Sequence, residues 1–181
     1  MNTIDEFKSK GFIVVKKFID KETTDKLYEY TLINKKNGTF DPQVPNTPAF
    51  YKDNEMNNLQ IKVHKNIEDL VGLPLFKTYN YYRTYKRDDI LKIHKDRPAC
   101  EISVTLNLGY RGNPWGIWIT DFDEIPHEVI MEPGDALLYR GCDLNHWRVK
   151  NTFCDDCSQV FLHFVNQNGP FNWAKDDLRR E

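Results

Sequence analysis

Residues 101–108 read Glu-Ile-Ser-Val-Thr-Leu-Asn-Leu, and apolar and polar side chains alternate through them without a break. Successive side chains of an extended strand point to opposite faces, so this stretch has one apolar and one polar face. The apolar face carries Ile102, Val104, Leu106 and Leu108, and the polar face carries Ser103, Thr105 and Asn107. The pattern predicts a strand that packs on a core with one face and lines a polar pocket with the other.

Seven further short segments rich in aromatic and β-branched residues surround this strand, and turn residues separate them. They span residues 78–85, 90–96, 115–120, 128–131, 136–139, 145–149 and 159–165. About eight short strands with turns between them are typical of an antiparallel sandwich or barrel. We therefore expect a mainly β protein with a jelly-roll core over about residues 76–166, in a single domain of 181 residues.

The N-terminal part, about residues 1–75, is expected to support this core with helices packed on one sheet. A short helix, a turn at Gly11 and a strand over residues 12–15 come first. Asp20 is a candidate N-cap for a helix over residues 21–33. Residues 34–64 are rich in Asn, Pro and Gly, and they predict a long loop that is either a lid or a meandering surface segment.

The charge and hydropathy of the chain exclude several classes of protein. The formal net charge is −2 and the pI is about 6.2, which argues against a nucleic-acid-coating protein. The longest apolar run is far shorter than the roughly 20 residues that cross a bilayer, so we expect no membrane span. The acidic N-terminus does not resemble a signal peptide, so a cytoplasmic location is expected.

Two histidines and one aspartate are the candidate metal ligands. His94 and Asp96 lie two residues apart on a predicted strand, so both side chains can face one point. His146 lies on another predicted strand and can supply a third ligand. Two imidazoles and one carboxylate form the facial triad of non-haem Fe(II) oxygenases, which leaves positions open for a co-substrate and O2.

The sequence contains, in this order, His94-x-Asp96, Pro133-Gly-Asp-Ala-Leu-Leu138 and His146. This order of motifs resembles that of the 2-oxoglutarate- and Fe(II)-dependent dioxygenases. The resemblance is to the prolyl-4-hydroxylase-like and phytanoyl-CoA-hydroxylase-like members and spans roughly residues 76–166. It implies a double-stranded β-helix, Fe(II) bound by His94, Asp96 and His146, and 2-oxoglutarate and O2 as co-substrates. It also implies hydroxylation of an unactivated C–H bond, with release of succinate and CO2. The substrate would be a small molecule or a peptide or protein residue.

The resemblance also implies a basic residue that binds the far carboxylate of 2-oxoglutarate. Prolyl hydroxylases carry it on the last core strand, where this chain has Ser158-Gln-Val-Phe161 and no cation. The candidates are therefore Arg148, two residues after His146, and then Arg83. Tyr85, Thr105 and Gln159 are the candidate hydrogen-bond donors to the co-substrate. A surface ion pair for Arg148, and cross-strand packing for Arg83 and Tyr85, are the competing interpretations.

Other residues favour simpler interpretations. Cys154-x-x-Cys157 has the spacing of a redox pair or of half a zinc site, but the main interpretation is an ordinary loop pair without function, which could also form an adventitious disulfide. We expect His64 and His127 to be solvated and His163 to be a hydrogen-bonded core residue. A non-catalytic jelly roll that binds a metal or ligand is the alternative function, because the usual basic residue is missing from the last strand.

Overall fold

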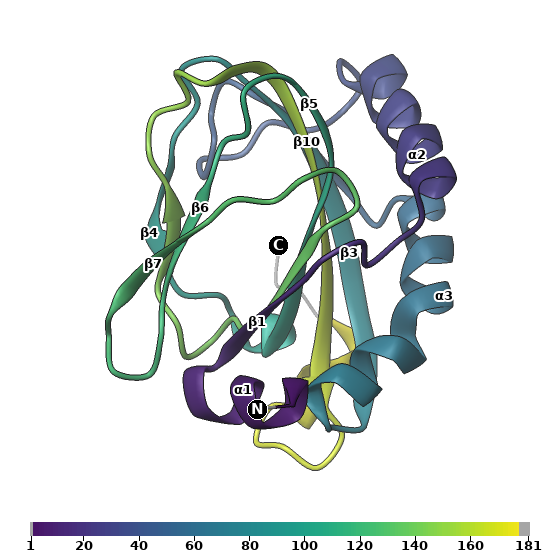
Figure 1. Cartoon of the computed structure of the whole chain (residues 1–181). Coiled ribbons are helices and arrows are strands. Elements are labelled where there is room, and N and C mark those ends of the chain that lie inside the picture. Colours follow the sequence, from purple (N-terminus) through teal and green to yellow (C-terminus); the bar gives the residue numbers. More distant parts are fainter. Residues whose placement is uncertain (1, 178–181) are drawn as a thin grey trace.

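Two antiparallel sheets face each other in the computed structural model, which describes residues 2–177 (Figure 1). The larger sheet has the order β1 (Phe12–Val15), β8 (Ala136–Arg140), β5 (Ile102–Gly112), β10 (Cys154–Asn166), β3 (Leu75–Lys86) and β2 (Ala49–Tyr51). The smaller sheet has the order β4 (Leu91–His94), β9 (His146–Arg148), β6 (Ile117–Thr120) and β7 (Pro126–Val129). This arrangement confirms the prediction of a mainly β jelly roll.

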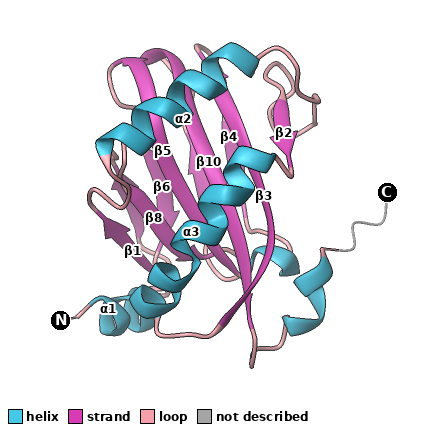
Figure 2. Cartoon of the chain, turned by 90° about the vertical axis from the view of Figure 1, so that its right-hand side faces the viewer, coloured by secondary structure: helices cyan, strands magenta, loops and turns pink. Residues whose placement is uncertain are grey.

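Three helices precede the core and pack against the larger sheet, as expected. They are α1 (Thr3–Lys10), α2 (Lys21–Asn34) and α3 (Asn54–Val71), and α2 and α3 cross the outer face of that sheet (Figure 2). Gly11 ends α1 in the left-handed conformation, with φ of 83°, and Asp20 caps α2 by accepting a hydrogen bond from the Thr23 amide. Apolar side chains of α2, α3 and the sheet form the main core between these layers.

The prediction of one long loop over residues 34–64 is wrong in its second half. Asn54–Val71 is an 18-residue helix, and Ala49–Tyr51 is a strand at the edge of the larger sheet. The Asp53 side chain caps the helix, and its buried face carries Met56, Leu59, Gln60, Val63, Ile67 and Val71. The asparagines of the first turns are compatible with a helix because this apolar face packs on the sheet, and burial outweighs their weak propensity.

Strand β5 has the two faces that its sequence predicts. Its apolar side chains belong to the core beneath the helices. Its polar side chains, those of Ser103, Thr105 and Asn107, are also buried, with at most 2% of their surface exposed. They point between the two sheets, because side chains alternate along a strand. The space between the sheets is therefore lined by polar groups on this side.

Two strand ends differ from the prediction. Strand β4 ends at His94, so Asp96 lies just beyond it, where its amide donates to the Gly141 carbonyl oxygen at 2.8 Å. Strand β10 begins at Cys154 rather than at Gln159, with a bulge between Cys154 and Asp156 in its pairing with β5. The bulge leaves Asp155 exposed and turns both Cys154 and Cys157 inward, where both are free thiols.

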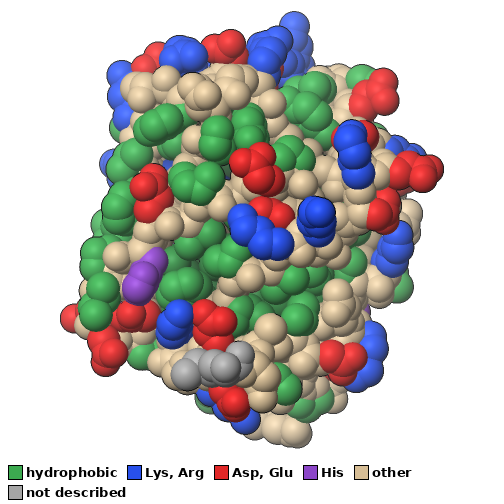
Figure 3. Space-filling view, viewed as in Figure 1, with side chains coloured by type: hydrophobic (Ala, Val, Ile, Leu, Met, Phe, Trp, Pro, Cys, Tyr) green, Lys and Arg blue, Asp and Glu red, His purple; other side chains and the backbone are tan. Residues whose placement is uncertain are grey.

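The outer surface mixes charges of both signs. Figure 3 shows Lys and Arg side chains interspersed with Asp and Glu on one face, and apolar side chains gathered along the edge that carries β6 and β7. Among residues 2–177, none of the helices has the length and hydropathy that crossing a bilayer requires.

Candidate metal centre

The structure brings His94, Asp96 and His146 together at one end of the smaller sheet. Strands β4 and β9 pair with His94 opposite His146, and their rings lie 4.3 Å apart. Oδ1 of Asp96 is 3.7 Å from Nε2 of His94 and 3.4 Å from Nε2 of His146. The three donor atoms lie within 4.8 Å of one another, so one cation could contact all three after small rotations.

Backbone carbonyls fix the orientation of both imidazoles. Nδ1 of His94 donates to the Lys92 carbonyl oxygen at 2.8 Å, and Nδ1 of His146 donates to the Leu144 carbonyl oxygen at 3.1 Å. Since a carbonyl only accepts, the neutral form of each ring carries its proton on Nδ1 and its lone pair on Nε2. Both lone pairs therefore face the Asp96 carboxylate, as metal-ligating histidines require.

The charges of the three residues are coupled. Burial alone would raise the pKa of Asp96, but His146, His163 and His94 hold it well below its usual value. Burial, together with the neighbouring His146, lowers the pKa of His94. Burial also opposes the charged form of His146, but the effect of the Asp96 carboxylate is larger, so the pKa of His146 is raised. A carboxylate that stays ionised beside two lone pairs is a donor set suited to a divalent cation.

Asp96 also takes part in a second network on its other side. Its Oδ2 accepts a hydrogen bond from Ser103 Oγ at 2.9 Å, and the same hydroxyl lies 2.9 Å from Nδ1 of His163. Cys100 is next to this network, and its thiol lies 3.0 Å from the Tyr79 hydroxyl. The expectation of a hydrogen-bonded, buried His163 agrees with this geometry. His64 and His127 lie elsewhere and are only partly exposed, with His127 paired to Asp121.

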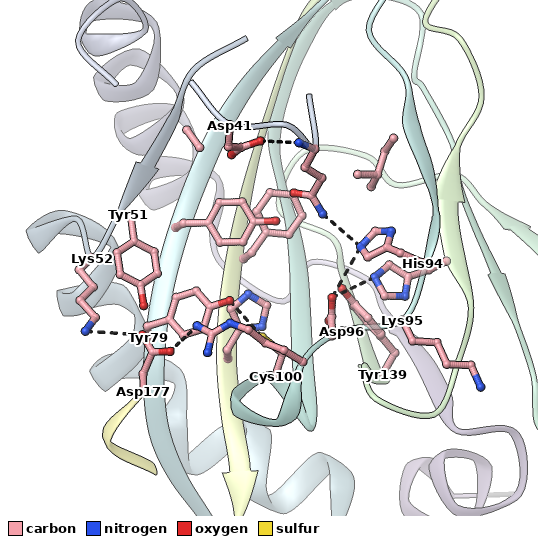
Figure 4. Close-up of a pocket in the computed structure, with 18 of the residues that line it drawn as sticks. Asp41, Tyr51, Lys52, Tyr79, His94, Lys95, Asp96, Cys100, Tyr139 and Asp177 are labelled. Atoms are coloured by element: carbon pink, nitrogen blue, oxygen red, sulfur yellow. Dashed lines mark hydrogen bonds and ion pairs between the residues drawn. The ribbon is translucent and has the colours of Figure 1, made fainter. Parts of the chain in front are cut away.

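A cavity of about 1050 Å³ opens beside the triad. Figure 4 shows Tyr51 and Tyr79 on one side of it and His94 and Asp96 on the other. Tyr51, Tyr79, Tyr81 and Phe161 form a continuous aromatic wall with ring separations of 4.3 to 6.4 Å. From the loop before β2, the Gln43 side chain reaches Nε2 of His94 at 3.2 Å.

Arg148 is almost fully buried, with 1% of its surface exposed, so it forms no surface ion pair. One terminal nitrogen, Nη1, donates to the Trp115 carbonyl oxygen at 2.5 Å, while Nε and Nη2 have no hydrogen-bond partner among the described residues. Its guanidinium lies over the rings of Trp115 and Tyr85, 5.0 and 6.0 Å from their centres. It lies behind the cavity wall, since Leu91 and Phe161 line the cavity and pack in the same cluster as these rings.

Arg83 has a different environment. Its terminal nitrogens donate to the Asp41 carboxylate at 2.5 Å and to the carbonyl oxygens of Val44 and Thr47, both at 3.2 Å. These contacts fix the loop over residues 41–47 against strand β3. The arginine thereby holds in place the segment that carries Gln43.

The other co-substrate candidates predicted from the sequence, Tyr85, Gln159 and Thr105, lie in different places around the cavity wall. Tyr85 is buried between the guanidinium groups of Arg83 and Arg148. Gln159 donates to Asn107 Oδ1 and contacts Cys157 Sγ, both at 3.0 Å, and its Oε1 has no partner among the described residues. Thr105 lies on the metal side, 3.5 Å from the hydroxyl of Tyr139, whose ring packs edge-on against His146.

The aromatic wall and the network around Ser103, Cys100 and His163 were not predicted from the sequence. Tyr79, Tyr81, Arg83 and Tyr85 follow one another at a spacing of two on a predicted strand, so they share one face. This spacing could have placed Tyr79 and Tyr81 on the pocket face. The polar face of β5 already included Ser103. The contact of Gln43 with His94 has no local sequence signal, because it depends on how the loop crosses the cavity.

Comparison with known proteins gives a fold but no close relative. No protein-family model matches the chain, and no curated protein sequence matches it. Solved structures do match it at 10 to 14% identity. A prolyl-4-hydroxylase from Pseudomonas putida aligns with a TM-score of 0.70 and 11% identity, over 89% of this chain and 96% of its own.

HygX from Streptomyces hygroscopicus, crystallised with nickel, 2-oxoglutarate and hygromycin B, aligns with a TM-score of 0.72 and 14% identity, over 92% of this chain and 87% of its own. EctD from S. alaskensis with bound Fe aligns with a TM-score of 0.73 and 13% identity, over 93% of this chain and 78% of its own. The chain has the fold of the 2-oxoglutarate/Fe(II) oxygenases. In this chain the residues of the candidate triad line the cavity at one end of the smaller sheet.

Proposed function

We propose that this protein is an Fe(II)- and 2-oxoglutarate-dependent oxygenase that hydroxylates an unactivated C–H bond of a small-molecule substrate. The observation that carries the proposal is the pair of imidazole Nε2 lone pairs directed at one ionised carboxylate beside a large cavity. Two imidazoles and a carboxylate match the facial set that non-haem iron prefers. In this proposal His94, Asp96 and His146 hold the iron.

We also propose that Arg148, which lies behind the cavity-lining side chains of Leu91 and Phe161, binds the far carboxylate of 2-oxoglutarate once those side chains move aside. A buried guanidinium with two unpartnered nitrogens, Nε and Nη2, carries a desolvation cost that a carboxylate partner would offset. Arg148 follows His146 by two residues on β9, so both side chains face the space between the sheets. Tyr85 and Gln159 lie on β3 and β10, which pair with each other in the larger sheet, and Thr105 faces the metal side, so we propose them as polar groups around the co-substrate.

Bound iron, 2-oxoglutarate and O2 supply the oxidising chemistry, in which succinate and CO2 are released as the substrate is oxidised. The residues of the chain bind and orient the reacting groups and exclude water from them. The carbonyl oxygens of Lys92 and Leu144 hold the imidazoles in register, and Ser103 holds the carboxylate. The aromatic wall lines the cavity across from the triad and offers apolar surface on which a substrate could pack.

A small-molecule substrate fits the cavity, whose volume of about 1050 Å³ is typical of sites for drug-sized ligands. HygX, with this fold, was crystallised with hygromycin B, which is also a small molecule. Proteins with this fold also include the epimerase SnoN and the carbocyclase SnoK, so hydroxylation is our proposal for the reaction class.

The test is an assay of succinate formation by the purified protein with Fe(II), 2-oxoglutarate and O2, and of Fe(II) and 2-oxoglutarate binding without O2. The parent and a His127→Ala control should bind both and form succinate. His146→Ala should not bind iron, and it should not bind 2-oxoglutarate either, because that binding depends on the iron. Succinate formation at the parental rate in His146→Ala, or failure of the parent to bind 2-oxoglutarate, would reject the proposal and favour a non-catalytic ligand-binding jelly roll.

A further inference from the structure

A second set of potential metal ligands lies on the far side of Asp96 from the two triad histidines. Asp96, Cys100 and His163 offer an oxygen, a sulfur and a nitrogen that all lie within 4.8 Å of one another. They come from the segment after β4, from the 3-10 helix Pro98–Cys100 and from β10, so the fold gathers them. We propose that these three side chains form a second metal site, selective for a soft divalent cation such as Zn²⁺.

The two oxygens of Asp96 face different donor sets. Oδ1 lies 3.4 Å from Nε2 of His146 and 3.7 Å from Nε2 of His94. Oδ2 faces Ser103, whose hydroxyl lies 2.9 Å from both that oxygen and His163 Nδ1. A carboxylate can give one oxygen to each of two cations. The second set therefore requires no reversal of the Asp96 side chain.

The position is accessible and has room. Asp96, Cys100 and His163 all line the cavity, so a hydrated cation reaches them through the same opening as the triad. Gly141 permits this placement of Asp96, because a Cβ at this position would overlap Oδ2 of Asp96 and the Cys100 carbonyl oxygen and lie 2.9 Å from Ser103 Oγ. A glycine at this point lets Oδ2 of Asp96 lie against the backbone, on the side where Cys100 and Ser103 are found.

The chemistry of the donors selects the cation. A thiolate, an imidazole and a carboxylate with a fourth place for water form a four-coordinate set that zinc favours. The triad lacks sulfur and suits Fe(II), so the two sets differ in softness. On binding, the cation replaces the thiol proton of Cys100, which leaves to solvent, and a Zn–S bond forms without any change of oxidation state.

Sharing of Asp96 couples the two sites. A cation on Oδ2 withdraws negative charge from Oδ1 and lies close to any cation held by His94 and His146, so occupancy of one site weakens the other. The existence of the second site does not depend on the proposed oxygenase activity. Its test therefore uses metal binding alone.

Co²⁺ is a suitable probe, because a cobalt–thiolate bond adds a charge-transfer absorption in the near ultraviolet that imidazole and carboxylate ligands lack. The full-length His94→Ala/His146→Ala variant should bind one Co²⁺ with this absorption, and Zn²⁺ should displace it. Adding Cys100→Ser should abolish the absorption, and adding Cys142→Ser, a nearby thiol outside the set, should leave it unchanged. Circular dichroism checks that each variant is folded.

A second variant keeps the test decisive if Cys100→Ser does not fold. His163→Gln in the same background retains the thiol but removes the nitrogen, and it should weaken Co²⁺ binding at least ten-fold. The proposal is overturned if the double histidine variant shows no thiolate absorption. It is also overturned if the absorption survives Cys100→Ser and disappears in Cys154→Ser, which would place the cation at the other buried thiols.

Discussion

Ser103 donates a hydrogen bond to Oδ2 of Asp96 at 2.9 Å, which leaves Oδ1 of the same carboxylate directed at the two triad imidazoles. The serine lies on the polar face of β5, and Asp96 lies in the turn after β4, so the bond connects the two sheets at the metal centre. A hydrogen bond to one oxygen fixes the rotation of the carboxylate. While the serine hydroxyl occupies Oδ2, a cation held by the two triad imidazoles is coordinated through Oδ1.

Loss of this hydrogen bond should weaken metal binding without removing a ligand. Ser103→Ala is expected to lower the Fe(II) affinity about ten- to a hundred-fold, which is typical for residues that orient a ligand. Anaerobic titration calorimetry measures the change. Ser158→Ala is the matched control, since Ser158 is also a buried serine of the larger sheet but its hydroxyl bonds to Thr31 and Thr84. An affinity within two-fold of the parent in Ser103→Ala would contradict this role.

Much of the fold could be predicted from periodicity. Strand alternation located β5, and the turn residues between strands indicated the jelly roll, because each strand buries one face in a core and directs the other between the sheets. The helix Asn54–Val71 could not be recognised so easily. Its first turns contain three asparagines, which favour turns locally, and only packing of its apolar face on the sheet overrides that tendency.

The candidate site was predictable where it depends on strand geometry. His146 and Arg148 share a face because they are two residues apart on β9, and both are buried as that spacing implies. Asp96 lies beyond the end of β4, and its position depends on a backbone hydrogen bond to Gly141, 45 residues later in the chain. Long-range contacts of this kind, including those of Arg83 with the loop over residues 41–47, leave no local pattern to recognise.

The two buried arginines should respond differently to mutation. Arg148→Ala is expected to weaken 2-oxoglutarate binding about ten- to a hundred-fold or more, because each charge-assisted hydrogen bond is worth roughly 1.5–3 kcal/mol. Arg148→Lys should recover only part of that affinity, since an ammonium replaces a planar fork. Iron affinity should change little in either variant. Calorimetry with 2-oxoglutarate and a redox-inert metal measures the effect, and unchanged binding in Arg148→Ala would move the anchor elsewhere.

Arg83 should affect stability and loop order rather than co-substrate binding. Arg83→Met removes its hydrogen bonds to Asp41, Val44 and Thr47 and should cost about 3 kcal/mol of unfolding free energy, because these carbonyl oxygens lose a buried charged donor. Urea denaturation measures the loss. Hydrogen exchange should show faster exchange over residues 41–47. If Arg83→Met instead loses 2-oxoglutarate affinity with little change in stability, the co-substrate anchor belongs on β3.

The Asp53 carboxylate caps α3 and also accepts a hydrogen bond from Tyr30 of α2, so its removal should affect both helices. It accepts from the Met56 amide at 3.1 Å and from the Tyr30 hydroxyl at 2.8 Å. Asp53→Ala removes both the cap and the acceptor for Tyr30 and should cost about 1–2 kcal/mol of unfolding free energy, whereas Asp53→Asn keeps a capping oxygen and should cost only a few tenths of a kcal/mol.

The pH dependence of that difference follows from Tyr30. Burial, followed by the hydrogen bond to Asp53, raises the pKa of Tyr30 from 10.0 to about 12. A raised pKa of this kind contributes stability that is complete below pH 10 and is lost as the pH rises through 12. The stability difference between the parent and Asp53→Ala should therefore be largest near neutral pH and shrink above pH 10, because an ionised Tyr30 no longer donates to Asp53. Urea midpoints of the parent and of Asp53→Ala at several pH values measure this difference. A difference that grows above pH 10 would show that the hydrogen bond from Tyr30 to Asp53 does not contribute to stability.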